Sequence, residues 1–156
     1  KSLNHFLNPR FFFQWAHEVL KKDGRLVLEV KNFRQQARQS GCIHYAIQID
    51  HPFMFVPETL SQFVRAAGFE ILFFEVDEEK SRAERLAQKK DGLPAGHIRL
   101  AAKKAEQMPF AAAIPENPEL VRRLGRQLSP WNLYVTYLIR YATPMRNFLN
   151  RVGLEP

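Results

Sequence analysis

The sequence predicts an α/β fold in which helices pack against a sheet. Helical segments at residues 9–22 and between Pro57 and Gly68 are each followed by a short, nearly continuous apolar run, at residues 25–30 and 69–76. Such runs are typical of buried strands, and the connections between them are long enough for helical crossovers. Together with a last apolar run at residues 97–103, this alternation indicates a layered α/β domain.

The first helix-to-strand unit is defined by its boundary residues. Asn8 followed by Pro9 is typical of a helix start, because asparagine caps free backbone N–H groups and proline fits the first helical position. Apolar residues then recur at helical spacing as far as Leu20. Gly24 ends the unit, and the strand at residues 25–30 follows directly.

The segments after this strand carry weaker patterns. Between Ile43 and Ile49, apolar and polar residues alternate, which predicts a half-buried strand or an extended lid segment. Pro57 opens the second helix and Gly68 closes it. Residues 77–95 are highly charged and predict an exposed helix or a long loop before the last strand.

The C-terminal third of the chain predicts a helical tail. A linker at residues 105–118 separates an α/β domain, residues 1–104, from the tail at residues 119–156. Proline marks the expected helix starts, at Asn117-Pro118, Ser129-Pro130 and Thr143-Pro144. Tyrosines and arginines on one face of the tail favour packing on the sheet or a homodimer contact, with peripheral membrane contact as the alternative.

Composition narrows the classes of function. The formal net charge is +7, but the basic residues are spread along the chain without a dense tract, so nucleic-acid binding is not favoured. The single cysteine, Cys42, excludes an internal disulfide and fits the cytoplasm. No apolar run has the roughly 18 residues of a membrane span. Because Lys1 begins within a patterned segment, we expect a fragment of a longer protein.

Two blocks of the sequence resemble class I S-adenosylmethionine-dependent methyltransferases. The first contains Ser2-Leu-Asn-His-Phe-Leu-Asn-Pro9, and it continues through Leu20-Lys-Lys-Asp-Gly-Arg-Leu-Val-Leu-Glu-Val30. It is similar to the family's fourth-strand exit, following helix and fifth strand, where members often read Leu-Glu-His-Leu and Leu-Lys-Pro-Gly-Gly. The second, His51-Pro-Phe-Met-Phe-Val-Pro-Glu-Thr-Leu60 through residue 70, is similar to the family's substrate-side loop and penultimate helix. The resemblance covers about residues 2–104.

The resemblance implies a partial Rossmann-like three-layer sandwich, consisting of the last strands of a mixed sheet with flanking helices. It implies methyl transfer from S-adenosylmethionine to an O or N acceptor of a small molecule or glycan intermediate. The family's glycine-rich turn and acidic strand end, which hold the cofactor, do not occur in this chain. We therefore expect activity in the full-length parent and not in this fragment. The alternative is a non-catalytic methyltransferase-like module that binds a protein, a membrane surface or nucleic acid.

The candidate site residues follow the strands. Ligands of open α/β sheets bind beyond the carboxyl ends of the strands, which singles out Asn4, His5, Glu29, Lys31 and Asn32. Because Glu29 lies near the end of a buried strand, we expect it to line an open cleft or, more commonly, to form a salt bridge with a nearby Lys or Arg. Asn4 and His5 are the expected cofactor contacts, and Lys31 and Asn32 the expected substrate contacts. His5 is also the candidate catalytic base, because a neutral imidazole can take a proton from an acceptor. The alternative for His5 is a structural hydrogen bond to the backbone.

The loop at residues 50–57 supplies the remaining candidates. We expect His51 to contact substrate, with Asp50 as a neighbour that orients an imidazole or raises its pKa. Phe55 is a candidate pocket wall, although core packing is the commoner role of such aromatics. Cys42 and His44 are too loosely spaced from His51 to indicate a metal site, and none is predicted.

Overall fold

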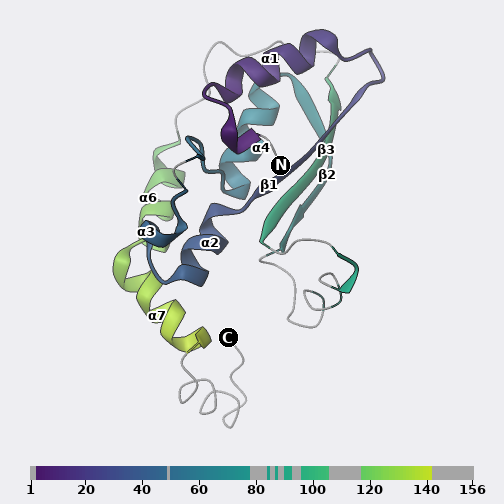
Figure 1. Cartoon of the computed structure of the whole chain (residues 1–156). Helices are drawn as coiled ribbons and strands as arrows, with labels where there is room; N and C mark the ends of the chain where they lie inside the picture. Colours follow the sequence, from purple (N-terminus) through teal and green to yellow (C-terminus); the bar gives the residue numbers. More distant parts are fainter. Residues whose placement is uncertain are drawn as a thin grey trace. The chain divides into compact units, whose positions relative to one another are not determined.

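The computed structural model describes residues 3–48, 50–77, 84, 87, 90–92, 96–105 and 117–141. The elements in these ranges are drawn in Figure 1. They are η1 (Leu3–His5), α1 (Pro9–Val19), β1 (Arg25–Lys31), α2 (Phe33–Ser40), α3 (Ile43–Ala46), α4 (Pro57–Ala66), β2 (Phe69–Val76), β3 (His97–Lys104), α6 (Pro118–Gln127) and α7 (Pro130–Tyr141). The chain divides into two compact units. The first comprises Lys1–Phe33 and Ile49–Glu116, and the second comprises Arg34–Gln48 and Asn117–Pro156.

The first unit contains an open, three-stranded antiparallel sheet, which confirms the α/β class. The strand order is β1-β3-β2, and β3 runs antiparallel to both of its neighbours. The strands lie within one residue of their predicted limits. Because β1 and β2 are both antiparallel to β3, they run in the same direction as each other.

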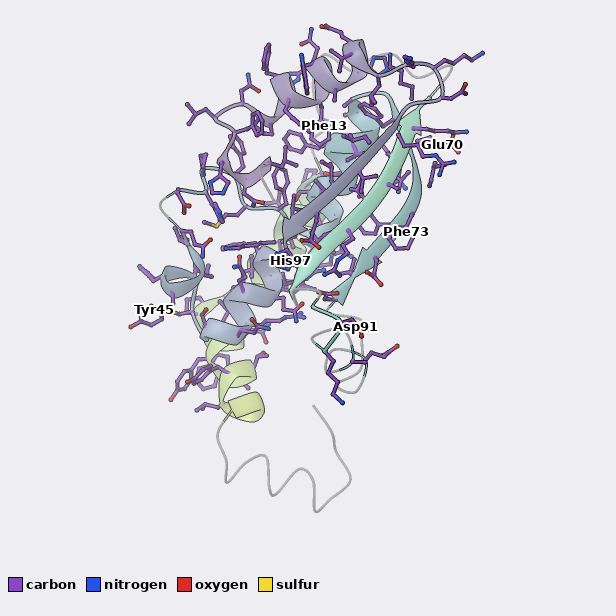
Figure 2. All side chains as sticks on the ribbon, turned by 45° about the vertical axis from the view of Figure 1, so that its right-hand side comes forward. Phe13, Tyr45, Glu70, Phe73, Asp91 and His97 are labelled. Atoms are coloured by element: carbon purple, nitrogen blue, oxygen red, sulfur yellow. The ribbon has the colours of Figure 1, made fainter. Side chains whose placement is uncertain are left out.

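One face of this sheet carries the hydrophobic core. Helices α1 and α4 lie on that face, and Phe13 of α1 points toward the strands (Figures 1 and 2). The buried cluster consists of Leu3, Phe13, Ala16, Leu26, Val30, Phe55, Leu60, Val64, Ala67, Phe69, Val76, Ile98, Leu100 and Ala102. Outside it, Val27 is 73% exposed and Phe73 is 52% exposed. The strands are therefore buried on one face and more accessible on the other.

The helix boundaries follow the predicted capping residues. The side chain of Asn8 accepts a hydrogen bond from the backbone N–H of Phe11 at 3.1 Å, as expected of a cap. Helix α1 ends at Val19, before the predicted limit at residue 22, because Leu20 already has an extended backbone. Gly68 follows α4 with φ +78°, a left-handed conformation that glycine adopts at little cost.

The predicted strand between Ile43 and Ile49 is wrong. The structure has a single helical turn there, α3, and the N–H of Ile47 donates to the carbonyl of Ile43 at 3.0 Å. Tyr45 is 82% exposed and Ile47 is 53% exposed, so these side chains do not line a buried strand face. Over so few residues, an alternating pattern does not distinguish a strand from a helical turn, because no longer-range periodicity is available.

The second unit combines the described part of the tail with α2 and α3. Helices α6 and α7 begin at the predicted Pro118 and Pro130. The Arg34 guanidinium donates to the side-chain oxygen of Gln127 at 3.1 Å. The predicted start at residues 143–144, the linker residues 106–116 and most of residues 78–95 lie outside the described residues. Among the described helices, none combines the length and apolar character needed to cross a bilayer.

Candidate functional site

Three side chains meet in the first unit, and two of them, His5 and His51, come from the two blocks of resemblance. His5 ends η1, whereas Asp50 and His51 lie in the loop before α4. The rings of His5 and His51 have centroids 4.5 Å apart and meet edge to face. Asp50 Oδ2 lies 3.6 Å from His5 Nδ1 and 4.0 Å from His51 Nε2. We call His5, Asp50 and His51 the histidine cluster.

A backbone contact fixes the tautomer of His5. Its Nδ1 lies 2.9 Å from the carbonyl oxygen of Asp50. A carbonyl oxygen only accepts hydrogen bonds, so Nδ1 carries the proton of the neutral ring and donates it in this bond. The lone pair of the neutral ring is therefore on Nε2, where it can accept a proton. The predicted structural bond and the predicted base chemistry are thus compatible in one side chain.

His51 is held in its neutral form. Its side chain is 7% exposed, in contrast to 47% for His5 and 66% for Asp50. Burial lowers the pKa of His51, the positive charge of Lys31 and the ring of His5 lower it further, and Asp50 partly opposes them. The cluster therefore has one embedded neutral imidazole and two more accessible polar groups.

Two hydrogen bonds fix the loop that carries Asp50 and His51. Asn4 is buried, and its Nδ2 donates to the carbonyl oxygen of Phe53 at 3.0 Å. The backbone N–H of Phe33 donates to the carbonyl of Phe55 at 2.9 Å. On either side of Met54, the loop is thereby tied to Asn4 and to Phe33, which both belong to the first unit. Asn4, expected to contact the cofactor, uses its amide N–H to position this loop.

The end of β1 contributes the other two predicted polar residues. Lys31 is the last residue of β1, and its positive charge acts to lower the pKa of His51. Asn32 is fully buried, and its backbone N–H donates to the carbonyl of Gly96 at 2.8 Å. Within the described part of the chain, neither polar atom of its side chain has a hydrogen-bond partner. Buried amides are normally hydrogen-bonded, so the side chain of Asn32 can form a hydrogen bond with a polar group of a ligand.

The remaining candidates have other surroundings. The ring of Phe55 is 2% exposed, belongs to the core cluster and meets Phe63 edge to face at 5.7 Å. Its position agrees with the core alternative. Cys42 and His44 belong to the second unit, whereas His51 belongs to the first.

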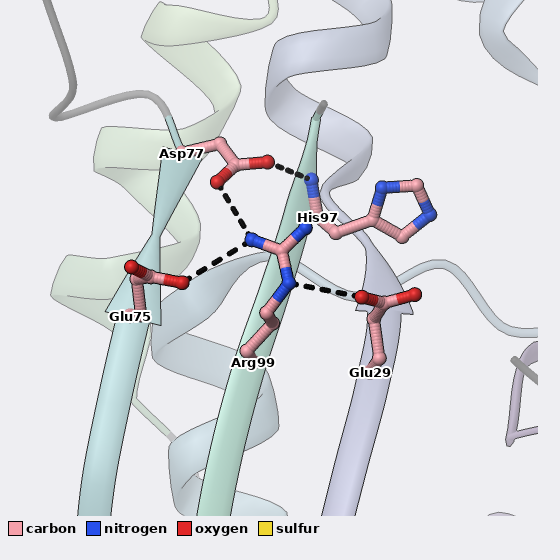
Figure 3. Close-up of polar contacts among 5 residues, drawn as sticks. All are labelled: Glu29, Glu75, Asp77, His97 and Arg99. Atoms are coloured by element: carbon pink, nitrogen blue, oxygen red, sulfur yellow. Dashed lines mark hydrogen bonds and ion pairs between the residues drawn. The ribbon is translucent and has the colours of Figure 1, made fainter. Parts of the chain in front are cut away.

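A second polar group lies on the strands themselves, and only its member Glu29 was singled out from the sequence. Arg99 of β3 lies directly between Glu29 of β1 and Glu75 of β2 in the strand register. Its guanidinium contacts Glu29 at 2.9 Å, Glu75 at 3.2 Å and Asp77 at 2.9 Å (Figure 3). Asp77 is fully buried and also accepts from the backbone N–H of His97 at 3.0 Å. We call the four charged residues the Arg99 network.

The Arg99 network is internally paired. Burial acts to lower the pKa of Arg99, but the hydrogen bonds that its guanidinium donates to Asp77, Glu29 and Glu75 and the negative charge of Asp77 outweigh it and raise the pKa. The expected salt bridge of Glu29 is confirmed by its contact with Arg99. The chemistry that the network can offer a ligand is limited because its guanidinium is already shared by three carboxylates.

Comparison with known proteins adds no family assignment: no protein-family model and no curated protein matches this chain. The site is therefore defined by its own geometry. The histidine cluster offers a proton acceptor, a carboxylate and a neutral imidazole within a few ångströms of one another. These groups suit proton transfer to and from a bound acceptor, or coordination of a cation.

Proposed function

We propose that this chain forms the acceptor side of an S-adenosylmethionine-dependent methyltransferase acting on an O or N atom of a small molecule or glycan intermediate. The observation that carries the proposal is the meeting of the two segments that resemble the family. His5 comes from the first segment and His51 from the second, and their rings lie 4.5 Å apart. Segments with an unrelated resemblance would have no reason to place their polar residues at one point.

The direction of the strands also supports the proposal. The resemblance implies the last strands of a mixed sheet, and β1 and β2 run in the same direction with β3 antiparallel between them. The polar residues Lys31 and Asn32 follow the carboxyl end of β1, where open α/β sheets bind their ligands. The positions of Lys31 and Asn32 at this end of β1 support the proposal.

His5 acts as the general base in this proposal. S-adenosylmethionine, when bound, supplies a methyl group on a positively charged sulfur. Nε2 of His5 would take up the proton that an O or N acceptor loses on methylation. The Asp50 carbonyl holds the ring at Nδ1, and the Asp50 carboxylate, 3.6 Å from Nδ1, stabilises the imidazolium that forms.

The other residues orient the acceptor. His51 is embedded and neutral, so it can give or accept one hydrogen bond without adding charge. The buried amide of Asn32 can pair with a polar group of the acceptor or the cofactor. Alignment of the reacting atoms is the larger part of catalysis in an in-line displacement, and a base adds about 10²- to 10⁴-fold.

The test measures S-adenosylhomocysteine, which forms whichever acceptor is methylated. The complete protein that contains this chain is incubated with S-adenosylmethionine and a panel of hydroxyl and amine acceptors. We expect product with at least one acceptor, and a rate about 10²- to 10⁴-fold lower for His5→Gln. His44→Gln, which changes an exposed histidine on α3, is the matched control and retains the parent rate. Absence of product, or a parent-like rate for His5→Gln, contradicts the proposal.

A further inference from the structure

We propose that the histidine cluster binds a divalent transition-metal ion of the zinc type, with His5, Asp50 and His51 as the protein ligands. Each of these residues offers one ligand atom, and the three atoms all lie within 4.8 Å of one another. This set differs from Cys42, His44 and His51, which were considered from the sequence. It shares only His51 with them and adds His5 from η1 and Asp50 from the loop before α4.

The spacing of the ligand atoms is close to that of a metal site. Zinc ligands lie about 2.0–2.1 Å from the ion, so tetrahedral ligands are about 3.3 Å apart. The carboxylate oxygen of Asp50 is 3.6 Å from Nδ1 of His5 and 4.0 Å from Nε2 of His51. The two ring nitrogens lie within 4.8 Å of each other, so the more exposed His5 and Asp50 must move by up to about 1.5 Å to bring all three ligand atoms onto one ion.

The ligand types select the kind of ion. Two imidazole nitrogens and one carboxylate suit zinc and neighbouring divalent transition metals, whereas magnesium and calcium prefer oxygen ligands alone. The carboxylate of Asp50 offsets part of the positive charge of the ion. The nearby charge of Lys31, which also acts on His51, weakens the attraction. We therefore expect moderate affinity rather than that of a closed structural site.

The surroundings leave part of the coordination sphere accessible. His51 is 7% exposed and holds the ion from the protein side, whereas Asp50 is 66% exposed and faces solvent. The hydrogen bonds of Asn4 and Phe33 to the loop fix the main chain around the ligands. Three protein ligands with the remaining positions accessible is the arrangement of catalytic rather than structural zinc sites.

Binding changes the role of His5, although it can occur without methyl transfer. Coordination through Nδ1 moves the ring proton to Nε2 and replaces the hydrogen bond to the Asp50 carbonyl by a metal–nitrogen bond. With the ion bound, His5 is a ligand and no longer a base. A bound ion would in that case lower the pKa of a coordinated hydroxyl. Ion binding requires neither the cofactor nor an acceptor, so it can be tested separately.

The experiment uses the 156-residue chain without an affinity tag, stripped of metal by a chelator. Zinc is titrated calorimetrically, and cobalt(II) reports the ligand set through its visible absorption. We expect one ion per chain. We expect Asp50→Asn and His51→Gln each to lower the affinity for zinc at least about tenfold. Substitution of a residue that only hydrogen-bonds a metal ligand already lowers affinity by about that factor. His44→Gln and Cys42→Ser should bind like the parent.

The control variants distinguish zinc bound at the histidine cluster from zinc bound at Cys42 and from loss of folding. Circular dichroism checks that the variants are folded, and Asp50→Asn changes an exposed side chain whose loss leaves the core intact. No saturable zinc binding, or parent-like binding by Asp50→Asn and His51→Gln, contradicts the site. Loss of binding in Cys42→Ser, with loss of a near-ultraviolet thiolate–cobalt band, also contradicts it. The S-adenosylhomocysteine assay is run with a chelator, so that no ion occupies His5 and the two proposals fail separately.

Discussion

The Arg99 network and the histidine cluster are both groups of charged and polar side chains in the same unit, but they differ in how completely they are paired. In the Arg99 network, one guanidinium contacts three carboxylates, and the buried Asp77 also accepts from a backbone N–H. In the histidine cluster, the closest polar contact between members is the one from His5 to the Asp50 carbonyl, and the carboxylate of Asp50 lies farther from both rings. The comparison indicates that a structural group differs from a ligand-binding group in how fully its side chains are paired with one another, and not in how much charge it carries.

Burial gives the same contrast in energetic terms. Removal of either Arg99 or Asp77 should lower the free energy of unfolding, because the buried charge that remains has lost its partner. Asp50 and His5 are accessible to water, so their removal leaves no such charge behind. The two regions should therefore respond to substitution in opposite ways, one through folding and the other through binding and catalysis.

The largest expected effect follows from breaking the Arg99 network. Arg99→Met leaves the fully buried Asp77 without its guanidinium partner and should lower the free energy of unfolding by about 3–5 kcal/mol. Urea denaturation of the chain measures the change. The matched control is Lys103→Met on the same strand. Lys103 pairs with Glu70 at 3.1 Å with both side chains about half exposed, and such a surface pair is worth at most about 1 kcal/mol. Equal losses in the two variants would remove the distinction drawn for Arg99.

A smaller effect is expected at Asn4, which holds the loop that carries Asp50 and His51. Asn4→Ala removes the bond to the Phe53 carbonyl and should cost about 1–2 kcal/mol. It should also weaken zinc binding, because Asp50 and His51 are no longer held in place. Asn8→Ala is the control, since loss of this helix cap costs about 1 kcal/mol but removes no hydrogen bond to the loop that carries Asp50 and His51. If Asn8→Ala weakens zinc as much as Asn4→Ala does, the effect is general destabilisation and not loop positioning.

Within the histidine cluster, a substitution should barely change stability. Asp50→Asn alters a side chain that is 66% exposed and should shift the free energy of unfolding by no more than about 0.5 kcal/mol. Thermal and urea denaturation in the presence of a chelator measure it without a contribution from bound metal. A loss approaching that of Arg99→Met would show that the cluster is a structural group like the Arg99 network.

The smallest effect is a pH dependence that belongs to neither region. Burial, then the charge of Lys104, lowers the pKa of His17, with Glu18 opposing them. As the pH falls below about 6.5, the unfolded chain takes up a proton at this position before the folded chain does. Stability is thus fully present above that pH and declines toward the folded pKa. His17→Gln should lose less stability than the parent between about pH 7.5 and about pH 5.5. Identical declines would contradict the lowered pKa of His17.

Local signals account for most of what the sequence predicted correctly. Asn8-Pro9, Asn117-Pro118 and Ser129-Pro130 mark helix starts because a cap needs only adjacent residues. The apolar runs predicted all three described strands of the sheet. The segment from Ile43 to Ile49 failed because it is too short for its period to distinguish a strand from a helical turn.

Contacts between distant residues account for what the sequence did not predict. His5 and Asp50 were each considered, but they are 45 positions apart, and nothing local indicates that they touch. Glu29 and Arg99 are 70 positions apart and meet only because β3 lies between β1 and β2. Strand order depends on the packing of the whole sheet, which single-residue patterns do not encode. The residue types of the site were thus predictable, whereas their assembly was not.

The central claim is that the residues gathered around His5 and His51 belong to a methyltransferase. The most direct measurement is a calorimetric titration of S-adenosylmethionine into the complete protein that contains this chain. We expect saturable binding of one cofactor per protein, because the acceptor side is useful only next to a cofactor site. No detectable heat of binding and no cofactor-dependent rise in melting temperature would contradict the claim, and would leave the histidine cluster as a metal or partner site without methyl transfer.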